Sequence, residues 1–200
     1  MQACAVRNDE PATLARLGHW TEDVYRDLLA VEGGQLTRDG FRARHCHRVA
    51  VLVLDIAGFT ERGMAVGEVD AFLRVLHAQR ICLPVLERRG AALVRAFADD
   101  LVALFGDPLQ ALEAALELHA AAEPADIGLC IGLGYGDVFA IGPNRAMGTE
   151  MNQASKLGED TARRGETLLT ESAYRAVEHR TDRDFIRHDD VLPFPFHAVA

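Results

Sequence analysis

The sequence VAVLVLDIAGFT, residues 49–60, joins an uncharged apolar run to a carboxylate and a glycine turn. Val49 to Leu54 predict a short strand that is buried on both faces. Asp55 falls where this strand leaves the core, and a carboxylate there is costly unless a cation or hydrogen bonds satisfy it. The amides of the glycine turn, with Thr60 capping a following helix, suit phosphate oxygens. We therefore predict a metal–nucleotide site in which Phe59 and Thr60 contact the substrate.

The composition predicts a globular protein whose partners are neither nucleic acid nor membrane. The 200 residues are 49% hydrophobic, which suits one domain with a core of ordinary size. The net charge is −9, and no block of Lys and Arg offers a surface for a nucleic-acid backbone. No apolar run approaches the roughly 18–20 residues that span a bilayer, and the N-terminus does not resemble a signal peptide. Four scattered cysteines without a CxxC pair indicate reduced thiols, so we expect a cytoplasmic protein.

The chain divides, by its patterning, into an N-terminal helical extension over residues 1–47 and a main domain over residues 48–200. Apolar residues three and four apart predict an amphipathic helix over 12–31, with Gly18 as a candidate break. Residues 35–47 are polar and basic, and we expect them to form a connecting loop. His45 and His47 in this loop lack further ligands, so they are expected to be solvated rather than metal-bound.

The main domain alternates strands and helices. Asp99 and Asp100 are expected at the tip of a hairpin over 92–105, and Phe97 is expected in the core. A helix-covered antiparallel sheet of the ferredoxin-like kind, an α+β fold with helices on one face, follows from this order. The other predicted elements are helices over 69–86, 108–122, 147–162 and 171–177, strands over 127–141 and 167–170, and an edge strand near the end of 185–199.

Asp55 and Asp99 are the candidate metal ligands. In a ferredoxin-like sheet, the end of the first strand and the turn of the next hairpin can lie side by side, so the two carboxylates are placed to share one or two Mg²⁺ ions. The alternative is that Asp99 and Asp100 are ordinary turn residues, because aspartate is common in turns.

Five segments together resemble the class III nucleotidyl cyclase homology domain, in the same order and at fitting separations. The resemblance covers roughly residues 48–178. It implies a ferredoxin-like α/β domain that pairs head to tail as a homodimer with active sites at the interface. It also implies conversion of a nucleoside triphosphate into a 3′,5′-cyclic nucleotide and pyrophosphate. The segments are DIAGFT (55–60), RAFADDLVALF (95–105), GLGYGDVFAIG (132–142), GTEMNQASKLGE (148–159) and GETLLTES (165–172).

The resemblance assigns roles to individual positions. Asp55 and Asp99 match the two aspartates that bind two divalent ions, Mg²⁺ or Mn²⁺, and the main-chain carbonyl of Ile56 matches a further metal ligand. Asn152 matches the asparagine that holds the ribose in the transition state. Lys156 falls where the family usually has an arginine, so the charge remains but the bidentate fork is lost.

Two substitutions concern the base. Arg95 and Arg145 replace a lysine and an aspartate of the adenine-specific pattern, and arginine can donate hydrogen bonds but not accept them. If Arg145 reaches the base, two donors favour a carbonyl-rich base, as in GTP or UTP; a shift of alignment by one residue would instead leave Arg145 on the surface. The chain also resembles short bacterial members that make cyclic UMP or cyclic CMP as antiviral signals.

Alternative functions remain open. One is an adenylate cyclase with an unusual base pocket. Another is a catalytically silent dimer that serves as a binding or scaffold module, which the substitutions at Arg95, Arg145 and Lys156 favour. The retained Asp55, Asp99 and Asn152 favour an active enzyme. The GGDEF-type signature of a diguanylate cyclase is absent from the hairpin, which reads ADDL.

Overall fold

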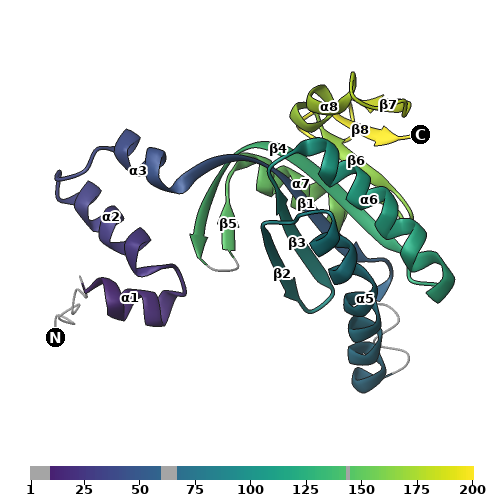
Figure 1. The fold of residues 1–200 in the computed structure, drawn as a ribbon, viewed down its shortest axis with the longest axis horizontal. Helices are drawn as coiled ribbons and strands as arrows, with labels where there is room; N and C mark the ends of the chain where they lie inside the picture. The colour runs from purple at the N-terminus through teal and green to yellow at the C-terminus, as the bar shows by residue number, and fades with distance from the viewer. Residues whose placement is uncertain (1–9, 60–66, 143–144) are drawn as a thin grey trace. The chain divides into compact units, whose positions relative to one another are not determined.

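The computed structural model describes residues 10–59, 67–142 and 145–200 (Figure 1). Two compact units make up the chain. The first comprises the described residues of 1–47 and of 138–147, and the second comprises 48–137 and 148–200. The predicted helix cap at Thr60 lies outside the described residues. Among the described residues, no helix is both long and apolar enough to cross a membrane.

The core of the fold is an eight-stranded sheet with the strand order β2-β3-β1-β4-β6-β8-β7, and β5 pairs with the far part of β4. Most pairs are antiparallel, as predicted, but β4 and β6 run parallel, so the sheet is mixed. The strands are β1 (Cys46–Ile56), β2 (Leu93–Phe97), β3 (Asp100–Phe105), β4 (Leu129–Gly142), β5 (Arg145–Met147), β6 (Thr167–Thr170), β7 (Phe185–His188) and β8 (Phe196–Val199).

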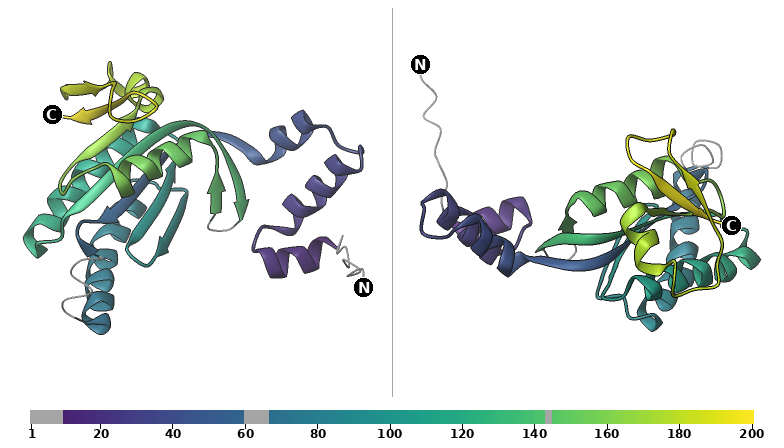
Figure 2. Two further views of the ribbon diagram at one scale, coloured as in Figure 1. Left: turned by 180° about the vertical axis from the view of Figure 1, so that it is seen from behind. Right: turned by 90° about the horizontal axis from the view of Figure 1, so that it is seen from above.

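The helices of the second unit cover both faces of the sheet, which corrects the expectation of a single covered face. The large core cluster joins β1 side chains such as Leu52 and Leu54 to α5 and α6, whereas α7 packs on the opposite face, seen nearest the viewer in the left view of Figure 2. A smaller cluster of Leu157, Leu168 and Phe196 lies on that side. The helices are α5 (Glu68–Arg88), α6 (Pro108–Ala122), the short η1 (Glu123–Ala125), α7 (Thr149–Asp160) and α8 (Glu171–Val177).

Glycines allow α7 to touch the backbone of the sheet. A Cβ atom on Gly132 of β4 would lie 2.0 Å from the carbonyl oxygen of Ala154 and 2.6 Å from the amide nitrogen of Gly158. A Cβ atom on Gly158 would in turn lie 2.7 Å from the carbonyl oxygen of Val53 in β1. The distance between α7 and the two central strands is thus set by glycine on both sides, which fixes the position of every side chain that α7 carries.

Gly132→Ala is expected to destabilise the protein by about 3 kcal/mol, because the new methyl group must push α7 away from β4. Gly106→Ala is the matched control. No atom lies within 4 Å of a Cβ atom built there, and the φ angle of Gly106 is not positive. Chemical denaturation would measure both variants. Equal free energies of unfolding for the two would show that α7 does not depend on this close approach.

The first unit packs three helices against the distal part of β4. Phe41 lies 6.0 Å from Phe139 between ring centroids, and the amide of Thr21 donates to the carbonyl of Ile141. The predicted helix over 12–31 is two helices, because His19 adopts a left-handed conformation (φ 64°) directly after Gly18. The helices are α1 (Pro11–Gly18), α2 (Glu22–Glu32) and α3 (Arg38–His45).

The prediction of a loop over residues 35–47 was wrong, because α3 occupies most of this segment. The hydroxyl of Thr37 accepts from the amide of Gly40 and caps this helix. His45 is not solvated: its side chain is 13% exposed, and its Nε2 lies 2.8 Å from a carboxylate oxygen of Asp27. Arg44 donates to the other oxygen of the same carboxylate. The contacts with Asp27 on α2 stabilise this polar sequence as a helix.

Three further expectations differ from the structure. The last strand, β8, lies between β6 and β7, so β7 is the edge strand. Phe97 is not in the core, because its side chain at the end of β2 is 71% exposed. The apolar spacing over 69–86 identified α5 correctly, but Phe72 in its first half is 70% exposed, since the helix buries side chains only from Ala78 onward.

Candidate functional site

Asp55 lies at the end of β1 on the face of the sheet that carries α7. Side chains alternate along a strand, and Leu54 and Ile56 on either side of Asp55 belong to the core on the α5–α6 face. Asp55 therefore points to the other face. Gly58, with a φ angle of 67°, then turns the chain immediately after the strand.

Asp99 reaches the same place from the β2–β3 hairpin. Leu54 in β1 pairs with Leu101 in β3, so the tip of the hairpin lies beside the end of β1. The tight turn is formed by Ala98, with a φ angle of 51°, and Asp99. Burial, together with the negative charges of Asp99 and Glu159, raises the pKa of Asp55 to about 7. The structure thus gathers the two aspartates that the sequence singled out.

Two further acidic residues of this cluster, Asp100 and Glu159, were not assigned to the site from the sequence. Nη2 of Arg95 donates to Oδ2 of Asp100 at 2.6 Å, so Arg95 faces the carboxylates of its own chain. Glu159 comes from α7; desolvation by the surrounding protein and the charge of Asp100 raise its pKa. The approach of α7 to the sheet brings Glu159 here, and that approach depends on its neighbour Gly158 in α7 and on Gly132 in β4.

The acidic cluster fits a divalent metal ion of the Mg²⁺ type. Oδ1 of Asp100 is buried and has no hydrogen-bond partner among the described residues. Burial and the negative charge of Asp99 raise the pKa values of Asp55 and Asp100, so the protein alone leaves negative charge there that a cation would neutralise. In the described part of the chain, no three His, Cys, Asp or Glu side chains are already gathered as metal ligands. The carbonyl of Ile56 and the oxygens of a bound phosphate would complete the set around Asp55 and Asp99.

Asn152 and Lys156 lie one turn apart on the exposed side of α7. Nζ of Lys156 donates to Asp160 at 2.9 Å, an exposed pair of low energetic value. Seven residues separate Asn152 from Glu159, which corresponds to about 10 Å along a helix axis. Within one chain, the structure does not bring Asn152 to the acidic cluster.

Glu150 anchors the start of α7. One oxygen of its carboxylate accepts from the amide of Tyr135 at 3.0 Å and from the hydroxyl of Thr170 at 2.7 Å. A Cβ atom on Gly136 would lie 2.7 Å from Cγ of Glu150. Two strands therefore hold the helical turn from which Asn152 projects.

Comparison with solved structures shows that the fold is similar to that of nucleotide cyclase domains. The adenylate/guanylate cyclase/hydrolase from Silicibacter pomeroyi matches with a TM-score of 0.66 and 21% identity, over 77% of this chain and 95% of that chain. The guanylate cyclase domain of RhGC from Catenaria anguillulae, in complex with GTP, matches with a TM-score of 0.65 and 18% identity, over 78% and 96%. The adenylyl cyclase CyaB from P. aeruginosa matches with a TM-score of 0.62 and 17% identity, over 78% and 95%. No protein-family model and no curated protein matches the sequence.

The chain has the class III nucleotidyl cyclase fold. The residues that the sequence analysis assigned to the substrate occupy different parts of this fold. Phe59 is half-buried against the core cluster, and Thr60 lies outside the described residues. Arg145 is exposed on β5 in the first unit. Arg95 belongs to the second unit.

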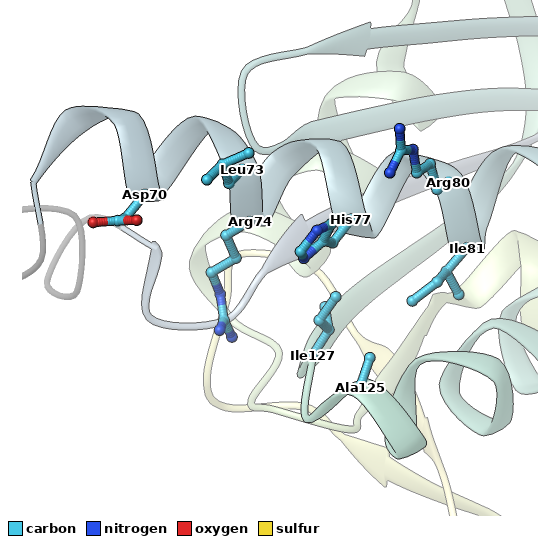
Figure 3. Close-up of a pocket in the computed structure, with 8 residues that line it drawn as sticks. All are labelled: Asp70, Leu73, Arg74, His77, Arg80, Ile81, Ala125 and Ile127. Carbon is cyan, nitrogen blue, oxygen red and sulfur yellow. The ribbon is translucent and has the colours of Figure 1, made fainter.

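An open pocket of about 500 Å³ lies elsewhere on the cyclase fold, between α5 and the segment that follows α6 (Figure 3). Its floor includes Ile127 and Ala125, and Figure 3 shows Arg74 pointing from α5 toward the chain below the helix. No carboxylate of the acidic cluster lines it. The remaining lining residues are Asp70, Leu73, His77, Arg80 and Ile81.

Proposed function

We propose that the protein is a nucleotidyl cyclase that converts a nucleoside triphosphate into a 3′,5′-cyclic nucleotide and pyrophosphate. The observation that carries this proposal is the convergence of Asp55 and Asp99 beside the glycine turn at Gly58. The same fold serves in the adenylyl and guanylate cyclase domains named above, which adds support. Residues 48–200 are proposed as the catalytic domain and residues 1–47 as an N-terminal extension.

The active site is proposed to be composite, with contributions from two copies of the chain. Asp55 and Asp99 come from one protomer. Asn152 lies about two helical turns from the carboxylates of its own chain, on an exposed helix face, so a second copy is needed to bring it to them. A head-to-tail homodimer supplies this arrangement twice, once for each pair of surfaces.

Each residue has a proposed task. Asn152 holds the ribose so that its 3′-oxygen faces the α-phosphorus, and Lys156 places a positive charge near the phosphoryl group. Lys156 must leave Asp160 to do so, at little cost for an exposed pair. The amides after Asp55 contact phosphate oxygens. Metal ions, when bound by Asp55, Asp99 and the carbonyl of Ile56, would activate the 3′-hydroxyl and neutralise phosphate charge.

The base is proposed to be rich in carbonyl groups, with UTP or GTP as the substrate. Arg145 donates and cannot accept, which disfavours the amino group of adenine. Arg95 keeps further N–H groups beside the one that contacts Asp100. If the product is a cyclic pyrimidine nucleotide, we propose that this product acts as an antiviral second messenger.

The proposal is tested by incubating the purified protein with ATP, GTP, UTP and CTP in turn, with Mn²⁺ and with Mg²⁺. We expect one triphosphate, UTP or GTP, to give equal amounts of 3′,5′-cyclic nucleotide and pyrophosphate, as measured by mass spectrometry and a coupled pyrophosphate assay. A preference for ATP would show that Arg145 does not select the base. Absence of any cyclic product would contradict the proposed activity.

A catalytically silent dimer is the second candidate. The observation that favours it is that Lys156 and Arg95 are each bound to an acidic residue of their own chain. Such a dimer would bind nucleotide without consuming it, so nucleotide binding without any cyclic product would support it.

A further inference from the structure

We propose that Glu150 is a positioning residue, whose carboxylate fixes the first turn of α7 on the sheet and thereby orients the side chain of Asn152. This inference rests on the proposed function, because that function gives Asn152 the task of holding the ribose. Glu150 itself touches neither the substrate nor the metal ions in this proposal. The glycines opposite Glu150, its contacts with β4 and β6, and the way in which α7 begins support the assignment.

Two glycines of β4 make room for Glu150. Gly134 and Gly136 are two residues apart in β4, so their Cβ positions lie on the same face of the sheet as that of Gly132. A Cβ atom on Gly134 would lie 2.7 Å from the carbonyl oxygen of Glu150. A Cβ atom on Gly136 would lie 2.7 Å from Cγ of Glu150, and the next nearest atoms also belong to this residue. The backbone and the side chain of Glu150 therefore both lie directly on β4.

The carboxylate of Glu150 continues the hydrogen bonding of β4 beyond the end of β6. The parallel pairing of β4 with β6 ends at Leu133 and Leu169, because β6 ends at Thr170, where α8 begins. The amide of Tyr135, two residues further along β4, donates to Oε2 of Glu150 at 3.0 Å. Glu150 thus satisfies a main-chain amide that β6 is too short to reach.

The same carboxylate oxygen joins α7 to the junction of β6 and α8. The hydroxyl of Thr170 donates to Oε2 of Glu150 at 2.7 Å and accepts from the amide of Ala173 at 3.2 Å, which caps α8. Thr170 is buried, so its hydroxyl is shielded from water and both hydrogen bonds are strengthened. One carboxylate oxygen therefore connects α7 to β4 and, through Thr170, to the start of α8.

The first turn of α7 depends on this connection. Among the described residues, no side chain caps the turn, because the residue before the helix is Gly148. The amide of Asn152 donates to the carbonyl of Gly148 at 3.0 Å and closes the turn. Residues two apart on a helix point about 200° away from each other, so Asn152 is exposed while Glu150 faces the sheet. The contacts of Glu150 therefore determine where Asn152 projects.

Hydrogen exchange at the Asn152 amide tests whether Glu150 holds this turn. Labelling with ¹⁵N at asparagine limits the NMR signals to Asn8, Asn144 and Asn152. We expect Glu150→Ala to speed exchange at Asn152 at least about tenfold, because two hydrogen bonds to a charged group are lost. Glu150→Gln removes the same charge but keeps an oxygen that accepts both bonds, so its exchange rate should stay close to wild type. An unchanged rate in Glu150→Ala would overturn the inference.

Steady-state kinetics test whether this hold matters for the reaction. We expect Glu150→Ala to lower kcat about 10- to 100-fold at a nearly unchanged KM, because a small displacement of a positioned group is costly. Glu150→Gln should restore most of the loss. The structural control is Asp107→Ala: Asp107 caps α6 and binds Arg180, so its loss should lower the melting temperature but change neither kcat nor exchange at Asn152. A wild-type kcat in Glu150→Ala, despite faster exchange at Asn152, would also overturn the inference.

A double-mutant cycle tests whether the effect passes through the side chain of Glu150. Gly136→Ala places a methyl group against Cγ of Glu150 and must displace that side chain, so it also serves alone if Glu150→Ala does not fold. We expect Gly136→Ala to lower kcat and to speed exchange at Asn152, but to add nothing in the Glu150→Ala protein. Equal effects in both backgrounds would contradict the inference. If the wild-type protein makes no cyclic product, the proposed activity fails, whereas the exchange rates still decide whether Glu150 holds Asn152.

Discussion

Asp55→Ala is expected to lower the rate of cyclic nucleotide formation by at least about 100-fold. Residues that only support a metal ligand already change metal affinity or activity 10- to 100-fold, so loss of a ligand itself should cost no less. The variant should remain folded, because alanine removes a carboxylate that is partly buried beside Asp99 and Glu159. Initial rates at saturating Mn²⁺ and triphosphate would measure the effect.

Asp182→Ala is the matched control for this experiment. Asp182 is an exposed aspartate after α8, outside the acidic cluster. Its replacement should leave the rate unchanged. If Asp55→Ala retained most of the wild-type rate, the carboxylates at the end of β1 would not be the catalytic metal ligands, and the proposed mechanism would be wrong.

Asn152→Ala is expected to lower kcat by about 100- to 1000-fold, with a smaller effect on KM. The amide of Asn152 is proposed to act on the ribose during the reaction rather than to bind the substrate beforehand. Gln153→Ala, one residue further along the same helix, is the control and should have little effect. A rise in KM by a similar factor, without a change in kcat, would instead mean that Asn152 contributes only to binding that is the same in the ground state and the transition state.

The sequence predicted the parts of the site that lie at the ends of strands. Val49 to Leu54 identified β1, so Asp55 could be placed at its end, and Asp99 was recognisable as the turn of a hairpin. The structure agrees with both positions. The main helices of the second unit were also predicted nearly to their boundaries, since Gly90 follows the end of α5 and Pro108 begins α6.

Other parts of the site and of the fold depend on tertiary contacts that local sequence patterns do not predict. Glu159 joins the acidic cluster only because Gly132 and Gly158 let α7 approach the sheet. Most of the loop expected over 35–47 is the helix α3, and the side chain of His45 in this helix contacts Asp27 on α2.

The composite site is tested most directly by mixing two inactive variants. Asp55→Ala and Asn152→Ala each damage both sites of their own homodimer. In a mixed dimer, one site receives Asp55 and Asn152 from the two intact surfaces, while the other receives both defects. After the subunits have exchanged at equal concentrations, we predict recovery of about a quarter of the wild-type rate, because about half of the dimers are mixed and each has one intact site. No recovery, while native mass spectrometry shows that mixed dimers are present, would contradict an active site shared between two chains.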